Sequence, residues 1–214
     1  MSVKNALILH EKFLNVCSHD FLNCITPMLS TTEMLKKKKF GKHQKRMINL
    51  IQGSVQTLHE LINIFFDAER MTHGLTVLKL SRVQVDNVAS AAIHDAKAFS
   101  NQKKVHLKKS VPKRLFLIAD ETYLAKALSY AVNSAIMMAP QNGTVHVRAY
   151  RSGEYVALSV SSARMGTMKP SFNLEPGTLK RCRDASLYVA KNIIKLHGGK
   201  VKTAKGQTTF FLRA

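Results

Sequence analysis

Apolar residues recur at every third or fourth position along the first third of the chain. This spacing keeps them on one side of an α-helix, and an alternation of threes and fours forms the seam of a heptad repeat. The first seam consists of Leu7, His10, Leu14, Cys17, Phe21, Cys24, Met28, Thr31 and Leu35. The pattern predicts a long amphipathic helix whose seam faces another helix.

A charged stretch then interrupts the pattern. The sequence KKKKFGK at 36–42 joins a lysine run to a glycine, which is typical of a turn between helices. The second seam consists of Met47, Ile51, Ser54, Leu58, Leu61, Phe65 and Ala68. Residues 1–72 are therefore expected to form a helical hairpin. Two copies would close into a four-helix bundle, which predicts a homodimer. The alternative is that the hairpin packs on the C-terminal domain of its own chain.

From about residue 78 the sequence predicts a second domain, residues 78–214, of a different kind. Strand-like patterns lie at 75–88, 103–111, 113–120, 142–161 and 200–214. Helical patterns lie at 88–102, 120–139 and 184–199. The 142–161 stretch reads as a hairpin with Ser152-Gly153 at its turn. The expected architecture is α+β, with helices packed on one face of a mostly antiparallel sheet.

Composition narrows the class of protein. Hydrophobic residues make up 45% of the 214 residues, enough for a sizeable core. No apolar run approaches the roughly 20 residues of a membrane span, and the N-terminus lacks the apolar core of a signal peptide. The three cysteines form no CxxC pair, which favours reduced thiols. We expect a cytoplasmic protein with no membrane partner.

The net charge of +20 favours anionic partners of any kind. Residues 73–214 hold most of it, with 23 Lys and Arg against 7 Asp and Glu. One hypothesis is therefore a basic module that binds nucleic acid or an acidic protein surface. Nucleic acid is not the favoured partner, because the basic residues are spread along the sequence without interleaved aromatic residues for stacking on bases.

The stretch CSHDFLNC at 17–24 carries the candidate chemistry. His19 falls at position f of the heptad, farthest from the seam, so its imidazole is expected to face solvent. Its ring nitrogens can carry a transferable group. Asp20 could orient the ring or accept its proton, and Asn23 lies one helical turn away on the same face. The predicted catalytic group is His19, Asp20 and Asn23.

The segment CSHDFLNCITPMLSTTEML resembles the phosphoacceptor box of bacterial sensor histidine kinases. In that box Ser-His-Glu/Asp is followed by an apolar residue, a basic residue and Thr/Asn; here Ser18, His19, Asp20, Phe21 and Asn23 match. Cys24 stands where proline is usual. The resemblance implies that the hairpin is a dimerisation and phosphotransfer domain. It also implies that 78–214 is an α/β-sandwich domain of the histidine kinase ATPase (GHKL) type.

The nucleotide-binding boxes depart from the family pattern. Asn133 matches the family's magnesium-binding asparagine, but Ser162 stands where an aspartate is usual. Gly166 alone remains of the glycines in the second box, and Asp184 and Ser186 replace the glycines of the third. Losing a buried acceptor and close-approach glycines is expected to weaken ATP binding roughly a thousandfold or more. The nucleotide site therefore reads as vestigial, with no tightly bound cofactor.

An intact phosphoacceptor beside a degenerate ATP-binding domain is similar to the histidine phosphotransferases of alphaproteobacterial cell-cycle phosphorelays. The resemblance implies a shuttle that takes a phosphoryl group from the receiver domain of an upstream hybrid kinase and passes it to a response regulator receiver domain. Mg²⁺ would arrive with the receiver domain, and no metal site of the chain's own is expected. The alternative from the same family is an atypical ATP-dependent histidine kinase core.

Overall fold

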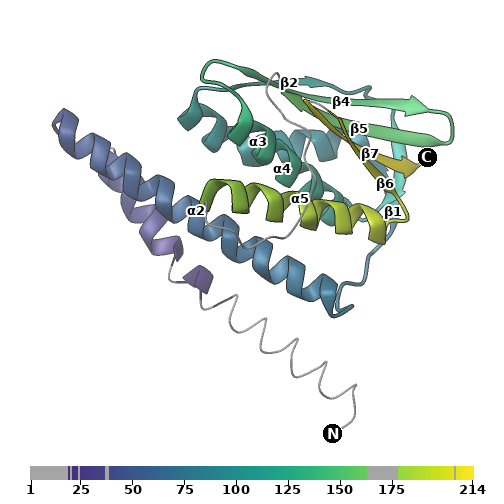
Figure 1. The fold of residues 1–214 in the computed structure, drawn as a ribbon, viewed down its shortest axis with the longest axis horizontal. Coiled ribbons are helices and arrows are strands. Elements are labelled where there is room, and N and C mark those ends of the chain that lie inside the picture. Colours follow the sequence, from purple (N-terminus) through teal and green to yellow (C-terminus); the bar gives the residue numbers. More distant parts are fainter. Residues whose placement is uncertain (1–18, 20, 24, 37–38, 163–177, 205) are drawn as a thin grey trace, which may run out of the picture. The chain divides into compact units, whose positions relative to one another are not determined.

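The computed structural model describes residues 19, 21–23, 25–36, 39–162, 178–204 and 206–214. The chain divides into two compact units, Met1–Thr76 and Val77–Ala214. Figure 1 shows long helices in the first unit and a layered arrangement of strands and helices in the second. Each unit is considered by itself below.

The first unit is a helical hairpin. The described part of its N-terminal helix comprises residues 19, 21–23 and 25–36, and the second helix is α2 (Lys42–Thr72). Between them, the Gln44 side chain accepts a hydrogen bond from the Gly41 N–H at 2.9 Å, which satisfies a backbone donor at the start of α2. The rings of Phe21 and Phe66 lie 6.4 Å apart, so the two helices run antiparallel. The predicted helical hairpin is confirmed, and residues 37 and 38 of the predicted turn lie outside the described residues.

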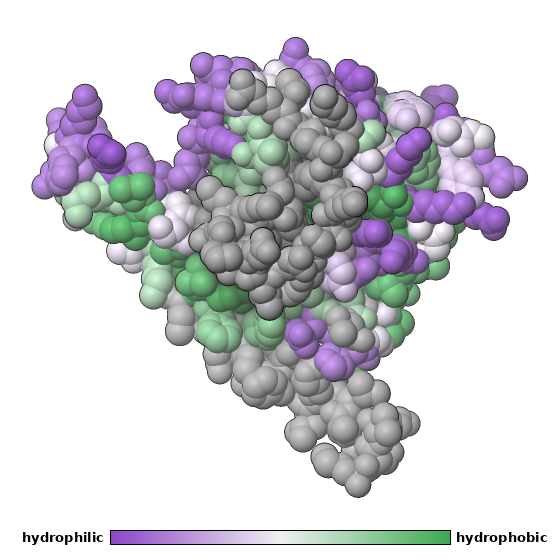
Figure 2. Space-filling model, viewed as in Figure 1, coloured by the Kyte–Doolittle hydropathy of each residue, from purple (hydrophilic) through white to green (hydrophobic). Residues whose placement is uncertain are grey.

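Burial on the hairpin follows a different stripe from the predicted seam. The buried residues include Ile25, Thr32, Ile48, Gln52 and Val55, each one position after a seam residue. One residue corresponds to about 100° around a helix. The seam itself is 47% to 55% exposed at Phe21, Met28, Met47, Ile51, Leu58 and Phe65. Green patches on the hairpin in Figure 2 mark such hydrophobic residues. In one chain the seam thus remains uncovered.

The second unit contains seven strands and three helices among its described residues. The strands are β1 (Ser81–Gln84), β2 (His106–Ser110), β3 (Phe116–Ala119), β4 (Thr144–Ser152), β5 (Tyr155–Ser162), β6 (Lys200–Ala204) and β7 (Gln207–Arg213). The helices are α3 (Val85–Lys103), α4 (Glu121–Met138) and α5 (Thr178–Leu196). A five-stranded sheet has the order β2-β4-β5-β7-β6, and β1 pairs with β3 separately.

The five-stranded sheet is antiparallel except where β2 pairs with β4. Its core face is apolar: Val147, Leu158, Val160 and Phe210 are at most 1% exposed. Figure 1 shows α3, α4 and α5 together on one side of these strands. The sequence prediction of helices on one face of a mostly antiparallel sheet is therefore confirmed.

Several predicted boundaries were wrong. The strand pattern at 75–88 yields only β1, because α3 begins at Val85 with Asp86 in its first turn. The turn of the β4–β5 hairpin is Gly153-Glu154 rather than Ser152-Gly153, since Ser152 pairs with Tyr155. Gly153 has φ 61°, and a glycine at the first of two loop residues suits a type II′ turn. Helix α5 begins at Thr178, earlier than the predicted residue 184.

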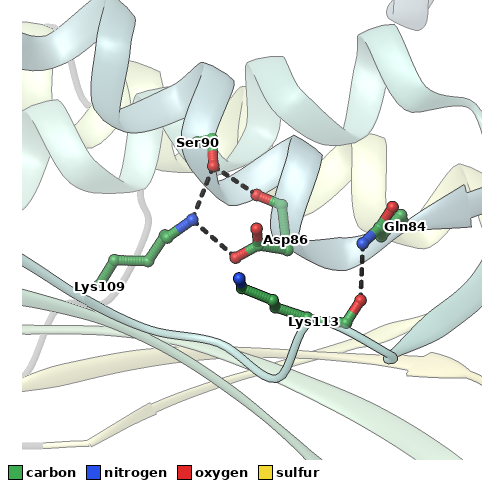
Figure 3. Close-up of polar contacts among 5 residues, drawn as sticks. All are labelled: Gln84, Asp86, Ser90, Lys109 and Lys113. Carbon is green, nitrogen blue, oxygen red and sulfur yellow. Dashed lines mark hydrogen bonds and ion pairs between the residues drawn. The ribbon is translucent and has the colours of Figure 1, made fainter.

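Hydrogen bonds and an ion pair join the helices of this unit to neighbouring strands and loops. The Asp120 carboxylate caps α4 by accepting from the Tyr123 N–H at 3.0 Å, and it also accepts from the Lys79 N–H at 2.8 Å. His197, just after α5, accepts from the Asp120 N–H through Nε2 at 3.0 Å. Figure 3 shows an ion pair between a strand and a helix: Lys109 Nζ on β2 lies 2.6 Å from Asp86 Oδ1 on α3.

Glycine is required where α5 gives way to β6. Gly198 has φ 70°, a region that side chains rarely adopt. At Gly199, a Cβ atom would lie 2.6 Å from the Phe211 backbone oxygen. The glycine pair that follows this helix is therefore needed for both backbone conformation and close packing.

Candidate functional site

The N-terminal helix presents His19 to solvent. Its side chain is exposed, as position f of the heptad predicts. The Asn23 Nδ2 atom, one turn along the same helix, lies 3.0 Å from His19 Nδ1 and 3.4 Å from Nε2. Asn23 is itself exposed. The structure thus brings two of the three predicted catalytic residues into contact on an open helix surface.

The contact between His19 and Asn23 links the amide orientation to the imidazole tautomer. When the Asn23 Nδ2 group faces the ring, it donates to an unprotonated Nδ1, and the ring proton sits on Nε2. Rotating the amide by half a turn brings Oδ1 to the same place, where it accepts a hydrogen bond from Nδ1–H. That second arrangement leaves Nε2 unprotonated, and an unprotonated ring nitrogen is what a nucleophilic histidine needs.

Asp20, the third predicted catalytic residue, lies outside the described residues. Its role as proton acceptor or ring-orienting partner stays a prediction. The same is true of Cys17 and Cys24, which flank the histidine in the sequence. The geometric case for the site therefore rests on His19 and Asn23.

A second histidine–asparagine pair occurs on α2 and was missed from the sequence. The stretch HELIN at 59–63 has the residue types and spacing of HDFLN at 19–23. The Asn63 Nδ2 atom lies 3.5 Å from His59 Nδ1 and 3.4 Å from Nε2. Both side chains are half-buried, and His59 continues the buried stripe of Gln52 and Val55 rather than the open face. The ring of His59 is therefore less accessible to another protein than the ring of His19.

Glu60 follows His59 as Asp20 follows His19. Burial raises the pKa of the Glu60 carboxyl from its ordinary value of 4.5 to about 7. Desolvation is the cause, since a buried carboxylate loses the water that stabilises its charge. Glu60 therefore changes protonation near neutral pH, and the hairpin carries a pH-dependent element close to its half-buried histidine.

The residues of the predicted vestigial nucleotide site are only partly described. Asn133 is half-buried on α4, Ser162 is buried at the end of β5 and Ser186 is buried on α5. Gly166 lies outside the described residues. Asp184 lies in α5, but its side chain is not among those described. The expectation that Asp184 would face phosphates with a negative charge stays a prediction.

Two buried hydroxyl groups in this region bear on whether it could bind ATP. Ser162 Oγ and Thr208 Oγ1 have no hydrogen-bond partner among the described residues. They lie on the neighbouring strands β5 and β7, both on the core face of the sheet. A hydroxyl can hydrogen-bond a nucleotide, but it lacks the charge of the aspartate that the family box carries at Ser162. The expectation of weak ATP binding stays a prediction.

The described part of the chain shows neither a membrane-spanning helix nor a cluster of metal ligands. None of its helices combines the length and apolarity that crossing a bilayer requires. In those same ranges, no three or more His, Cys, Asp and Glu side chains are arranged to hold a metal ion.

Comparison with known proteins places this geometry in a family context. Residues 9–74 match the His Kinase A (phospho-acceptor) domain. The chain is thus similar to histidine kinases. It is 22% identical to the circadian input-output histidine kinase CikA of Synechocystis, over 99% of this chain and 31% of that protein. It is 24% identical to an uncharacterized sensor-like histidine kinase of Rhizobium meliloti, over 92% of this chain and 41% of that protein. The chain thus spans less than half the length of these relatives.

Solved structures agree on the fold. Full-length ShkA in complex with AMPPNP superposes with a TM-score of 0.62 at 19% identity, covering 95% of this chain and 46% of that one. The Acinetobacter baumannii histidine kinase AdeS gives 0.60 at 12% identity, covering 90% and 96%. The predicted fold, a helical hairpin followed by a sandwich domain of the histidine kinase ATPase type, is therefore confirmed.

Proposed function

We propose that this chain is a histidine phosphotransferase in which His19 carries a phosphoryl group between receiver-domain aspartates. The observation that carries the proposal is an exposed histidine whose Nδ1 is held by Asn23 at 3.0 Å, in the segment that matches the phospho-acceptor family. A receiver domain is a protein-sized donor, so only an exposed imidazole can meet it.

The proposed reaction needs no group beyond the donor aspartyl phosphate. With the Asn23 Oδ1 atom accepting from Nδ1–H, the unprotonated Nε2 attacks phosphorus. The Nε2–P bond forms as the bond between phosphorus and the aspartyl oxygen breaks, and the aspartate leaves as a carboxylate with the electron pair. The ring then carries a positive charge, which Asp20 could balance by accepting the Nδ1 proton. The reverse steps deliver the group to the acceptor aspartate.

The partners follow from the same reaction. The donor would be the receiver domain of an upstream hybrid kinase, and the acceptor a response regulator receiver domain, each bringing its own Mg²⁺. We also propose that the chain acts as a homodimer. The exposed seam supports this, because half-exposed Phe21, Ile51 and Phe65 would lose contact with water in a four-helix bundle.

An ATP-dependent kinase is the second candidate function. It is favoured by the likeness to histidine kinases along 99% of the chain and by the buried, unpartnered hydroxyls of Ser162 and Thr208. Unsatisfied buried polar atoms carry a cost that a ligand could relieve. Against it stand the missing aspartate at Ser162 and the replaced glycine at Ser186, so a nucleotide-free shuttle is the preferred proposal.

Phosphoryl transfer to matched histidine variants tests both functions. The full chain is incubated with radiolabelled ATP alone, and separately with a radiolabelled phospho-receiver domain. His19→Gln removes the proposed carrier, whereas His59→Gln removes a ring with the same asparagine spacing on the half-buried stripe. Circular dichroism of both variants checks that the helices are retained.

The outcomes separate the candidates. Label taken from the receiver but not from ATP, lost in His19→Gln and kept in His59→Gln, supports the shuttle. Label taken from ATP alone and lost in His19→Gln supports the kinase. Label retained in His19→Gln, or absent from the wild type under both conditions, contradicts both functions for His19.

A further inference from the structure

The two faces of the five-stranded sheet carry opposite kinds of side chain. The core face is buried beneath α3, α4 and α5 (Figure 1). The strand register places the alternate residues on the other face, which we call the outer face. Its basic and aromatic residues are His106, Lys108, His146, Arg148, Tyr150, Tyr155, Lys200, Lys202, Phe211 and Arg213. Hydrophilic side chains line the margin above the strands in Figure 2.

No acidic residue occurs in any of the five strands of this sheet. The described carboxylates of this unit lie on α3, at the start of α4 or in the β4–β5 turn, at Asp86, Asp95, Asp120, Glu121 and Glu154. Lys109 shows the contrast: it turns to the helix side, where Asp86 and Ser90 bind its Nζ atom at 2.6 and 2.8 Å (Figure 3). Its neighbour Lys108 is exposed on the outer face. The outer face is therefore positively charged without internal neutralisation from its own strands.

The register arranges the outer face in rows across the strands. One row runs from Arg148 through Ser159 and Thr209 to Lys202. Its two ends are exposed, whereas Ser159 and Thr209 are buried between the longer side chains. The row thus has a cationic side chain at each end and two small, buried residues between them.

The next row carries the aromatic side chains. Tyr150 on β4 and Phe211 on β7 flank Ala157 on the central strand, and Lys200 follows on β6. Strands lie about 4.8 Å apart, so the two aromatic positions are separated by roughly 10 Å. Tyr150 is 45% exposed, and Phe211 is half-buried. Two rings and a lysine thus stand beside the row of Arg148 and Lys202.

This combination fits single-stranded nucleic acid better than an acidic protein. Phosphates need a row of cations, and unpaired bases need exposed rings on which to stack. An acidic protein surface would use the cations but would leave the rings unexplained. The folded sheet adds distant partners to this pair: Arg148 and Tyr150 on β4 are joined by Lys202 on β6 and Phe211 on β7 only when the strands pair.

We propose that the outer face binds single-stranded nucleic acid, with Arg148 and Lys202 contacting phosphates and Tyr150 and Phe211 stacking on bases. This activity is independent of phosphoryl transfer at His19. It gives the chain a second binding surface, on a sheet whose other face forms the core of its unit.

Fluorescence anisotropy of the full chain tests the proposal. The probes are labelled single-stranded oligothymidylate and oligouridylate of about 15 nucleotides, titrated from about 50 to 200 mM salt. Arg148→Glu with Lys202→Glu reverses two outer-face charges. Lys97→Glu with Lys195→Glu makes the same charge change at exposed positions on α3 and α5, in the helix layer. Tyr150→Ala removes a ring and no charge.

We expect the outer-face double variant to bind at least tenfold more weakly and to lose about 1.4 from the slope of log affinity against log salt. The helix-layer double variant should change affinity less than threefold. Tyr150→Ala should weaken binding by about tenfold, with little change in the salt slope. Binding of either oligonucleotide with this pattern supports the proposal.

Three results would overturn it. The first is no binding of either probe at low salt. The second is an equal loss in the two double variants, which would mean that only the overall charge attracts the probe. The third is that Tyr150→Ala has no effect while a labelled polyglutamate peptide binds as tightly as the oligonucleotides, which would assign the outer face to an acidic protein.

Discussion

The two units of the chain differ in how far their apolar side chains are buried. In the sheet unit the apolar side chains pack against one another in a core, and Leu158, Phe210 and Leu212 are at most 1% exposed. In the hairpin the predicted seam is left open, with Ile51 and Phe65 51% and 55% exposed. The sheet unit therefore has a complete core, whereas the hairpin has an apolar stripe that another surface must cover. Stability in the first should depend on single residues, and in the second on association.

Phe210→Ala should have the largest effect on this comparison. Its ring is 1% exposed, so its removal leaves a cavity and is expected to cost about 3–5 kcal/mol of unfolding free energy. Phe211→Ala is the matched control, because the neighbouring ring is half-buried on the outer face. Urea unfolding followed by circular dichroism measures both. Equal losses in the two variants would contradict the distinction between the faces.

Ile51→Lys combined with Phe65→Lys should break the hairpin seam. Charges at these exposed positions would be buried in a dimer, so we expect the dimer dissociation constant to rise at least a hundredfold, about 3 kcal/mol. Sedimentation of the full chain over a concentration series measures this. Val77→Lys with Leu80→Lys changes equally apolar, exposed residues of the other unit and should leave association intact. A wild type that is monomeric at all concentrations would contradict the proposed dimer.

Glu60→Gln should make the hairpin less sensitive to pH. The raised pKa of about 7 means that the folded chain keeps this proton while the unfolded chain, with an ordinary value of 4.5, loses it. The wild type should therefore lose stability as pH rises from about 4.5 to 7, by up to about 3 kcal/mol, and stay constant above that range. The variant should lack this loss. Urea titrations at about pH 5 and about pH 8 compare them, and an unchanged pH dependence in the variant would rule the explanation out.

Asp120→Ala should have the smallest effect of these. Its carboxylate accepts from the backbone N–H groups of Lys79 and Tyr123, so its removal leaves two donors unsatisfied, one of them in the first turn of α4. We expect a loss of about 1–2 kcal/mol, within the usual range for a helix cap. Asp120→Asn, which keeps an acceptor, should recover much of it. Thermal unfolding of the two variants decides whether capping is the cause.

The fold was predictable because its signals are local. The seam spacing and the lysine run indicated the helical hairpin, and the residue-by-residue alternation from 142 to 161 indicated the β4–β5 pair. Boundaries were less predictable. Val85 reads as part of a strand, yet it opens α3, because packing against the sheet decides where an apolar stretch changes conformation.

The candidate site was predictable in part. The position of His19 in the heptad indicated its exposure, and its spacing to Asn23 indicated contact on one helix face. The parallel pair at His59 and Asn63 was overlooked, although HELIN repeats the residue types of HDFLN. The two pairs differ in burial. Each has the same spacing along its helix, but they lie on different sides of their helices, so one faces solvent and the other is half-buried.

The sequence by itself determined the element types, the hairpin and the exposed histidine, because each depends on residues within a few positions of one another. The tertiary structure decided the rest. It separated the buried stripe of the hairpin from the predicted seam, and it gathered Arg148, Tyr150, Lys202 and Phe211 on one sheet face. Side chains alternate along each strand, and only strand pairing determines which distant residues become neighbours.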